Sequence, residues 1–61
     1  MPAQKLLTTA QLARELGVSP RTIVRWADRG WIYAAETFPS GHRRWSLEDV
    51  RHQLASARER Q

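Results

Sequence analysis

The chain contains no cysteine and only two histidines among its 61 residues. Disulfide bonds and zinc sites with thiolate ligands are therefore excluded, and two histidines are too few to complete a structural metal site. No apolar run approaches the length of a membrane span or of a signal-peptide core. We therefore expect a cytoplasmic protein whose stability depends on side-chain packing and helix capping.

Acidic residues are also few, six against ten basic ones, and the net charge is +4. All the basic residues except Lys5 are arginine. The planar guanidinium group forms paired hydrogen bonds with phosphate oxygens and guanine edges, which favours nucleic acid as a partner. A generic basic surface, or a host genome rich in G and C, is the alternative explanation of the charge.

Catalytic motifs are missing from the sequence. It has no Ser-His-Asp order, no glycine-rich phosphate loop and no cluster of metal ligands. Glu48 and Asp49 are adjacent, but they fall in the first turn of a predicted helix, where the helix dipole accounts for them. A chain of 61 residues forms one domain at most and has little room for a substrate pocket. We therefore expect a protein that is not an enzyme and that binds no cofactor or metal.

Three helix starts share one local pattern, in which a capping hydroxyl residue follows an apolar residue. The caps are Thr8, Ser19 and Ser46, and a second apolar residue occurs four positions after each. This is the arrangement of the hydrophobic staple, with the pairs Leu7 and Leu12, Val18 and Ile23, and Trp45 and Val50. The pattern predicts helices at about residues 9–16, 20–29 and 47–57, and Gly17 and Gly30 end the first two.

The links between these helices define the fold class. Residues 17–19 form the short glycine-containing turn of a helix-turn-helix. Residues 31–38 are rich in aromatic and β-compatible side chains, residues 39–41 interrupt them, and residues 42–45 form a short return strand that must lean on the helices. We predict a mainly α fold with a small β-hairpin, a winged helix-turn-helix of three helices plus a wing. It forms a single domain over residues 1–61, with an ordered core at about 6–57 and frayed ends.

The three tryptophans are interpreted first as structural. Trp26 and Trp45 are assigned to the core rather than to stacking on bases, because a small domain needs the large area that each side chain buries. Trp31 follows a glycine and precedes Ile32, which is the better core candidate. We expect Trp31 to be partly exposed and available to a protein partner.

The second predicted helix has an arginine-bearing face. Arg21 and Arg25 lie one turn apart, opposite the apolar stripe of the same helix, and Arg29 continues the basic face. Thr22 lies near the helix start, where recognition helices contact base edges, and it is a candidate for a thymine methyl group or a phosphate. The alternatives are a solvated face with Asp28 as a salt-bridge partner, a helix-start role for Thr22 and carbonyl capping by Arg29.

The predicted hairpin carries a second basic cluster. Gly41 permits a tight turn, and His42, Arg43 and Arg44 follow it at a tip that suits a minor groove. Side chains alternate along a strand, so one of the two arginines contacts phosphate or the groove floor while the other packs on the domain. Arg43 is the slightly favoured contact. His42 is either a phosphate donor or a turn residue.

The segments 12–23, 25–26, 30–32 and 41–45 together closely resemble the DNA-binding domain of the MerR superfamily. Within it, the chain is most similar to the small excisionase and BldC-type members, and the match covers about residues 7–54. The resemblance implies a winged helix-turn-helix with its second helix in the major groove and its wing at the adjacent minor groove. It also implies that the recognition helix contacts DNA through Arg21, Thr22 and Arg25. The corresponding wing residues are His42, Arg43 and Arg44.

The same resemblance implies a biological role. MerR regulators continue into a dimerisation helix and an effector domain, whereas this chain ends seven residues after Leu54, so we expect no small-molecule effector. Phage excisionases, or recombination directionality factors, bind repeated sites, bend DNA and direct integrase toward excision. The expected partners are double-stranded DNA, a phage integrase and neighbouring copies of the chain, in the nucleoid of a bacterial host. The alternatives are a BldC-like transcription regulator that binds direct repeats and the DNA-recognition module of a phage packaging protein.

Overall fold

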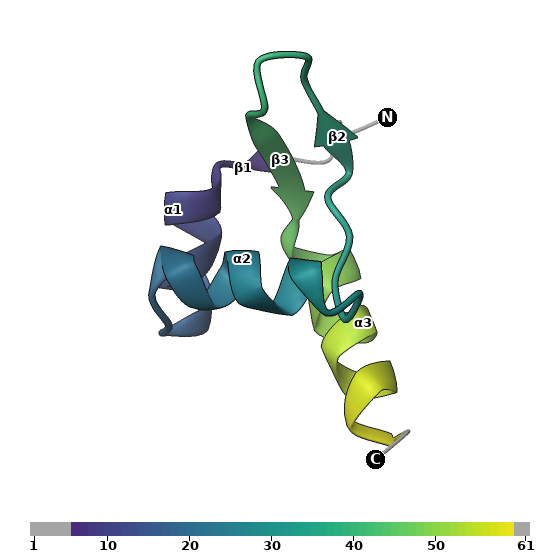
Figure 1. Cartoon of the computed structure of the whole chain (residues 1–61). Helices are drawn as coiled ribbons and strands as arrows, with labels where there is room; N and C mark the ends of the chain where they lie inside the picture. Colours follow the sequence, from purple (N-terminus) through teal and green to yellow (C-terminus); the bar gives the residue numbers. More distant parts are fainter. Residues whose placement is uncertain (1–5, 60–61) are drawn as a thin grey trace, which may run out of the picture.

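The computed structural model describes residues 6–59 of the chain (Figure 1). The predicted frayed ends at residues 1–5 and 60–61 lie outside this described part. Three helices, α1 (Thr9–Leu16), α2 (Pro20–Asp28) and α3 (Leu47–Glu59), surround a small sheet. The sheet consists of β1 (Leu6–Leu7), β2 (Glu36–Thr37) and β3 (Arg43–Ser46). The predicted mainly α fold, a winged helix-turn-helix, is confirmed.

Each helix begins at its predicted cap. The Thr8 hydroxyl accepts the Gln11 N–H at 3.1 Å, and the Gln11 side chain accepts the Thr8 N–H at 2.9 Å, which completes a capping box. The Ser19 and Ser46 hydroxyls each accept the N–H of the residue three positions on, at 3.2 and 3.3 Å. All three caps therefore satisfy backbone donors that the helix itself leaves unpaired.

Gly17 ends α1 and turns the chain toward α2. Its φ of +74° lies in the left-handed region that side chains with a Cβ disfavour. The Val18 N–H donates to the Ala13 carbonyl at 2.9 Å, and the Gly17 N–H donates to the Arg14 carbonyl at 3.3 Å, the two bonds of a Schellman motif. The turn is short, so α2 packs directly against α1.

The core is one cluster to which all three helices, β3 and the segment after α2 contribute. Its buried members are Leu12, Ala13, Ile23, Ile32, Trp45 and Val50. The remaining staple residues, Leu7 and Val18, pack against it, as does the half-buried Trp26. Trp45 on β3 is fully buried, and its indole N–H donates to the Thr9 hydroxyl at 3.0 Å. The predicted core role of Trp45 is confirmed.

The sheet differs from the predicted hairpin. Its strand order is β1-β3-β2, with both pairs antiparallel. We did not predict β1, because a strand of two residues has no alternation to detect. The first hairpin strand, predicted within residues 31–38, is confined to β2, since Ile32 instead enters the core. Two helix ends also shift, with α2 ending one residue earlier and α3 two residues later than predicted.

Residues 36–46, which are β2, β3 and the loop between them, form the wing. The Phe38 carbonyl accepts the Gly41 N–H at 2.8 Å, and the Phe38 N–H donates to the His42 carbonyl at 2.8 Å. Gly41 has a φ of +92°, as expected in a three-residue hairpin loop in which a turn is followed by a left-handed residue. The wing tip projects beyond the helices (Figure 1).

Candidate nucleic-acid interface

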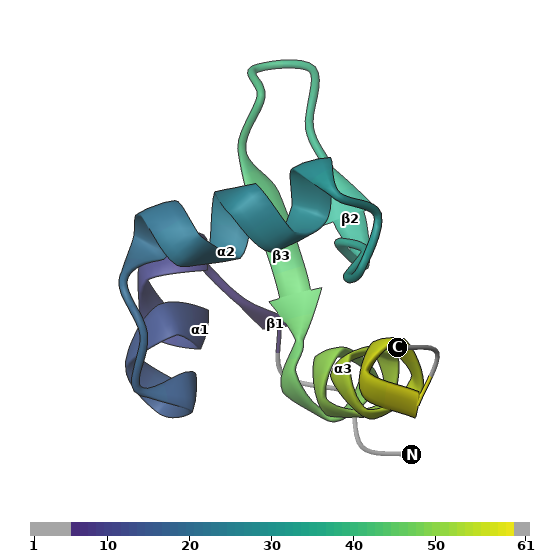
Figure 2. The ribbon, with the colours of Figure 1, turned by 60° about the horizontal axis from the view of Figure 1, so that its bottom comes forward.

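Helix α2 lies next to the wing (Figure 2). Arg21 and Arg25 are exposed on α2, while Ile23 of the same helix is fully buried. In both views of the ribbon the wing rises above α2, and α3 lies below it (Figures 1 and 2). The helix and the hairpin that carry the two predicted arginine clusters are therefore neighbours in the structure.

A groove of about 510 Å³ separates α2 from the wing. Val24 forms its α2 side, and residues 8–10 at the start of α1 close one end. The wing side consists of Gly41, His42, Arg43 and Arg44. The predicted wing residues thus line a hollow whose other side is the predicted recognition helix.

Within the wing, the two arginines have different surroundings. The Arg44 guanidinium carbon lies 5.5 Å from the centre of the Phe38 ring, a cation–π distance, and Arg44 Nη1 donates to the Arg43 carbonyl at 3.3 Å. Arg44 is thus the arginine that packs on the domain. Arg43 lies opposite Thr37 in the β2–β3 ladder and is half-buried. This arrangement leaves the Arg43 contact with DNA, which sequence reasoning favours, as a prediction.

His42 is exposed beside the wing turn. Its Nδ1 lies 2.9 Å from the Ser40 hydroxyl oxygen. This bond is local to the turn and uses Nδ1, so Nε2 of the same ring does not take part in it. The geometry is compatible with both roles considered for His42, as a phosphate donor and as a turn residue.

Thr22 and Arg29 have partners within the protein. The Thr22 hydroxyl oxygen lies 3.0 Å from the Ser19 hydroxyl oxygen, next to the α2 cap, and Thr22 is half-buried. The Arg29 guanidinium carbon lies 5.3 Å from the centre of the Trp31 ring. Trp31 is half-buried, as predicted. At about 100° per residue, Thr22 and Arg29 lie on the flank of α2 opposite to Val24, so the groove and these two residues face different directions.

Val24 is a site residue that sequence reasoning missed. It is 44% exposed and lies on the polar side of α2, three residues after Arg21 and directly before Arg25. The available signal was an apolar residue off the apolar stripe of the helix. The signal could not be interpreted from the sequence, because it does not show that the wing lies across a hollow from Val24.

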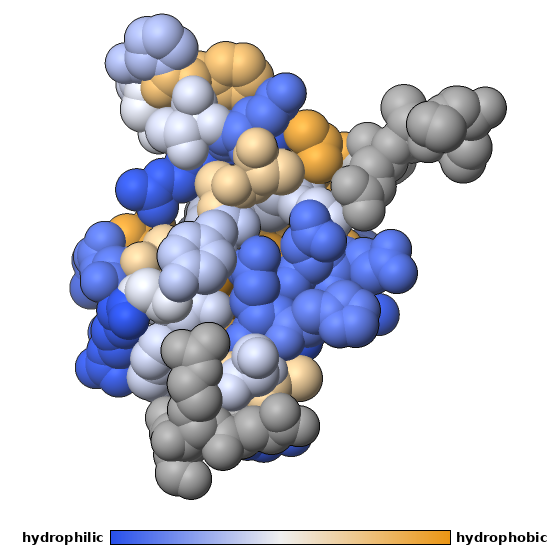
Figure 3. Space-filling model, turned by 90° about the vertical axis from the view of Figure 1, so that its right-hand side faces the viewer, coloured by the Kyte–Doolittle hydropathy of each residue, from blue (hydrophilic) through white to orange (hydrophobic). Residues whose placement is uncertain are grey.

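Charge alone does not locate the interface. Figure 3 shows a surface that is also largely hydrophilic, and α3 has exposed arginines of its own, Arg51 and Arg58. What distinguishes α2 is shape, because a helix with exposed arginines here borders a hollow that the projecting wing also lines. The combination, rather than the charge, defines the candidate interface.

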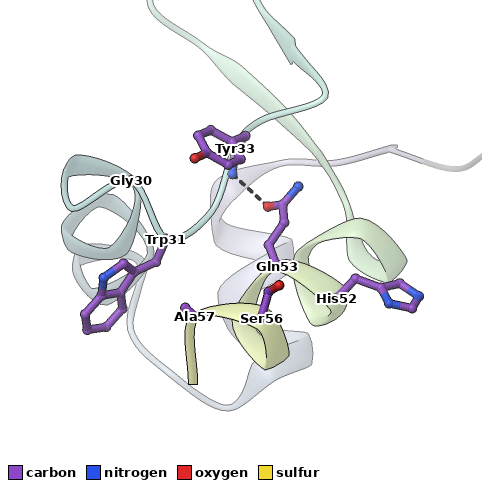
Figure 4. A pocket seen from close by; sticks show the side chains of 7 residues that line it. All are labelled: Gly30, Trp31, Tyr33, His52, Gln53, Ser56 and Ala57. Atoms are coloured by element: carbon purple, nitrogen blue, oxygen red, sulfur yellow. Dashed lines mark hydrogen bonds between the residues drawn. The ribbon is translucent and has the colours of Figure 1, made fainter. Parts of the chain in front are cut away.

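A second hollow, of about 340 Å³, lies between α3 and the segment that follows α2 (Figure 4). Gln53 of α3 reaches across it, and its Oε1 accepts the Tyr33 N–H at 2.8 Å. The Tyr33 side chain itself is 63% exposed. Gln53 therefore fixes the backbone that leads from α2 into the wing.

Replacing Gln53 with alanine should lower the free energy of unfolding by about 1 kcal/mol, because the Tyr33 N–H loses its acceptor. Urea unfolding followed by circular dichroism measures the change. Gln53→Glu keeps an acceptor oxygen and serves as the matched control. If the alanine variant unfolds at the same urea concentration as the wild type, the bond does not contribute to stability.

Two further features of the described residues bear on function. Within residues 6–59, no helix is long and apolar enough to cross a bilayer. The same part of the chain holds no group of three or more His, Cys, Asp or Glu side chains placed to bind a metal ion.

Comparison with known proteins agrees with the fold. The family model described as a helix-turn-helix domain matches residues 6–58, which include the two helices, the wing and most of α3. No curated protein sequence matches the chain. Because the matched region is most of the chain and contains the basic face of α2 and the wing, the protein belongs to the helix-turn-helix domain family of DNA-binding proteins.

Proposed function

We propose that the protein binds specific sites in double-stranded DNA, with α2 in the major groove and the wing at the adjacent minor groove. The observation that carries this proposal is the hollow that Val24 of α2 shares with residues 41–44 of the wing, on a helix whose Arg21 and Arg25 are exposed. A major groove admits one α-helix. A narrow minor groove has a strongly negative potential, which attracts arginine side chains such as those near a hairpin tip.

The two clusters have different tasks in this proposal. Arg25 is exposed on α2, and in a major groove its guanidinium group reaches base edges and forms two hydrogen bonds with guanine. Arg43 in the wing contacts the phosphate backbone, which supplies affinity without sequence preference. Specificity therefore comes mainly from α2, and the salt dependence of binding comes largely from the wing.

Replacing Arg43 with alanine should weaken binding to specific and random duplexes alike. Loss of one phosphate contact should also reduce the slope of log K against log salt concentration by about one. Fluorescence anisotropy titrations between low and moderate salt measure both effects. Arg51→Ala removes the same charge from the exposed side of α3 and should change the slope less. An unchanged slope in the Arg43 variant would show that this side chain contacts no phosphate.

For the biological role, we propose a recombination directionality factor of the excisionase type. The support is the resemblance of residues 7–54 to small excisionases, together with the limited interface that one such domain offers. A single small DNA-binding module buries about 600–1,000 Å² of its surface, so neighbouring copies or an integrase would increase its affinity through linked binding. The proposed partners are a phage integrase and further copies on repeated sites.

An in vitro recombination assay with the integrase encoded beside this gene tests the role. The protein should stimulate excision and inhibit integration on supercoiled substrates that carry the attachment sites. Arg25→Ala should abolish both effects, while Tyr33→Ala, which alters an exposed side chain in the hollow beside α3, should retain them. Specific DNA binding without any effect on either reaction, or the lack of a nearby integrase gene, would favour a BldC-like transcription regulator instead.

A further inference from the structure

Val24 is exposed where the fold has no evident use for it. The other large apolar side chains of α2, Ile23 and Trp26, belong to the core or pack against it, whereas Val24 is 44% exposed. A β-branched residue is also a weaker helix former than alanine, so local helix stability does not favour valine at this position. Neither packing nor propensity explains the side chain.

The surroundings of Val24 are polar and basic. Its neighbours on the exposed face of the helix are Arg21, three residues before it, and Asp28, four residues after it. Arg43 and Arg44 line the opposite side of the groove that Val24 borders. Val24 is thus an apolar spot on a charged surface that carries three arginines and one aspartate.

We infer that Val24 contacts the 5-methyl group of a thymine in the major groove, and so contributes to the choice of DNA site. The inference rests on the proposed docking of α2. The thymine methyl is the apolar feature that distinguishes base pairs in the major groove, whereas the other base-edge groups there are hydrogen-bond donors and acceptors. Arg21 and Arg25 suit those polar groups, and Val24, three residues after Arg21, suits the methyl group.

Thr22 also carries a methyl group, but the structure makes it the weaker candidate. Its hydroxyl oxygen lies 3.0 Å from that of Ser19 at the α2 cap, and the side chain is half-buried. It also lies on the flank of α2 that faces away from the groove. Thr22→Ser removes the methyl group and keeps the hydroxyl that lies next to that of Ser19. It is therefore the matched control for Val24→Ala.

The experiment begins with selection of a tight-binding duplex from a randomised library by the wild-type protein. Each thymine of that duplex is then replaced singly by deoxyuridine, which removes only the 5-methyl group. Affinities of the wild type, Val24→Ala and Thr22→Ser are measured for every duplex by fluorescence anisotropy. Thermal melting followed by circular dichroism checks that both variants are folded, as the exposure of Val24 leads us to expect.

At one thymine, deoxyuridine should lower wild-type affinity about fourfold, the effect of burying one methyl or methylene group. Val24→Ala should bind the thymine and deoxyuridine duplexes equally, and Thr22→Ser should keep the wild-type ratio. The inference is wrong if no deoxyuridine duplex differs from its parent, if Val24→Ala keeps the ratio, or if Thr22→Ser loses it. In each of these cases specific binding remains. If the selection enriches no sequence at all, the proposed function fails together with the inference.

Discussion

Replacement of Trp45 by alanine should leave much of the protein unfolded at 25 °C. Trp45 is fully buried at the centre of the sheet, packs in the core and donates a hydrogen bond to Thr9. Truncation of a buried tryptophan costs about 3–5 kcal/mol. A chain of 61 residues has a total stability of only about 3–9 kcal/mol at 0.05–0.15 kcal/mol per residue. Urea and thermal unfolding, followed by circular dichroism, measure the loss.

Two controls separate core packing from the general effect of losing an aromatic residue. Trp45→Phe keeps most of the apolar side chain but lacks the indole N–H, and it should lose less stability than the alanine variant. Tyr33→Ala removes a side chain that is 63% exposed, and it should melt close to the wild type. A Trp45→Ala protein that is soluble and melts normally would overturn the assignment of Trp45 as the centre of the core.

Replacement of Arg25 by alanine should weaken binding to a selected site far more than binding to random duplex. A bidentate contact between arginine and a base contributes about 1–3 kcal/mol of discrimination. This corresponds to a loss of roughly 5- to 150-fold that random DNA does not share. Competition titrations with both duplexes at one salt concentration measure the two affinities together.

Arg25→Lys is the matched control for this prediction, because it keeps the positive charge and removes the planar fork. It should retain most of the affinity for random duplex while losing part of the specificity. If Arg25→Ala lowers both affinities by the same factor, Arg25 contacts the phosphate backbone and reads no base.

The helices could be predicted closely because their signals are local. Caps at Thr8, Ser19 and Ser46 determine where each helix starts, and each hydrophobic staple lies within five residues of chain. The strands could not be predicted so well, because β1 and β2 are each two residues long and gain their structure from pairing with β3. No sequence periodicity exists over so short a segment.

The candidate site also has a part that local sequence predicts and a part that depends on the folded structure. Arg21 and Arg25 share a face because of their spacing on one helix, which the sequence shows directly. Val24 and residues 41–44 of the wing line one groove, and their proximity depends on how the wing is placed relative to α2 in the folded chain. The packing of Arg44 on Phe38 likewise depends on the loop conformation at Gly41. Alternation along β3 predicted that one arginine packs on the protein and slightly favoured Arg43 as the DNA contact; the structure places the Arg44 guanidinium over Phe38 of the wing.

Dimethyl sulfate footprinting of a selected duplex at low ionic strength probes guanine N7 in the major groove and adenine N3 in the minor groove, and it tests most directly whether α2 and the wing engage DNA together. Protection should cover one major groove and the minor groove beside it, on a single face of the duplex. Protection confined to one groove, or the lack of any protected position, would contradict the arrangement.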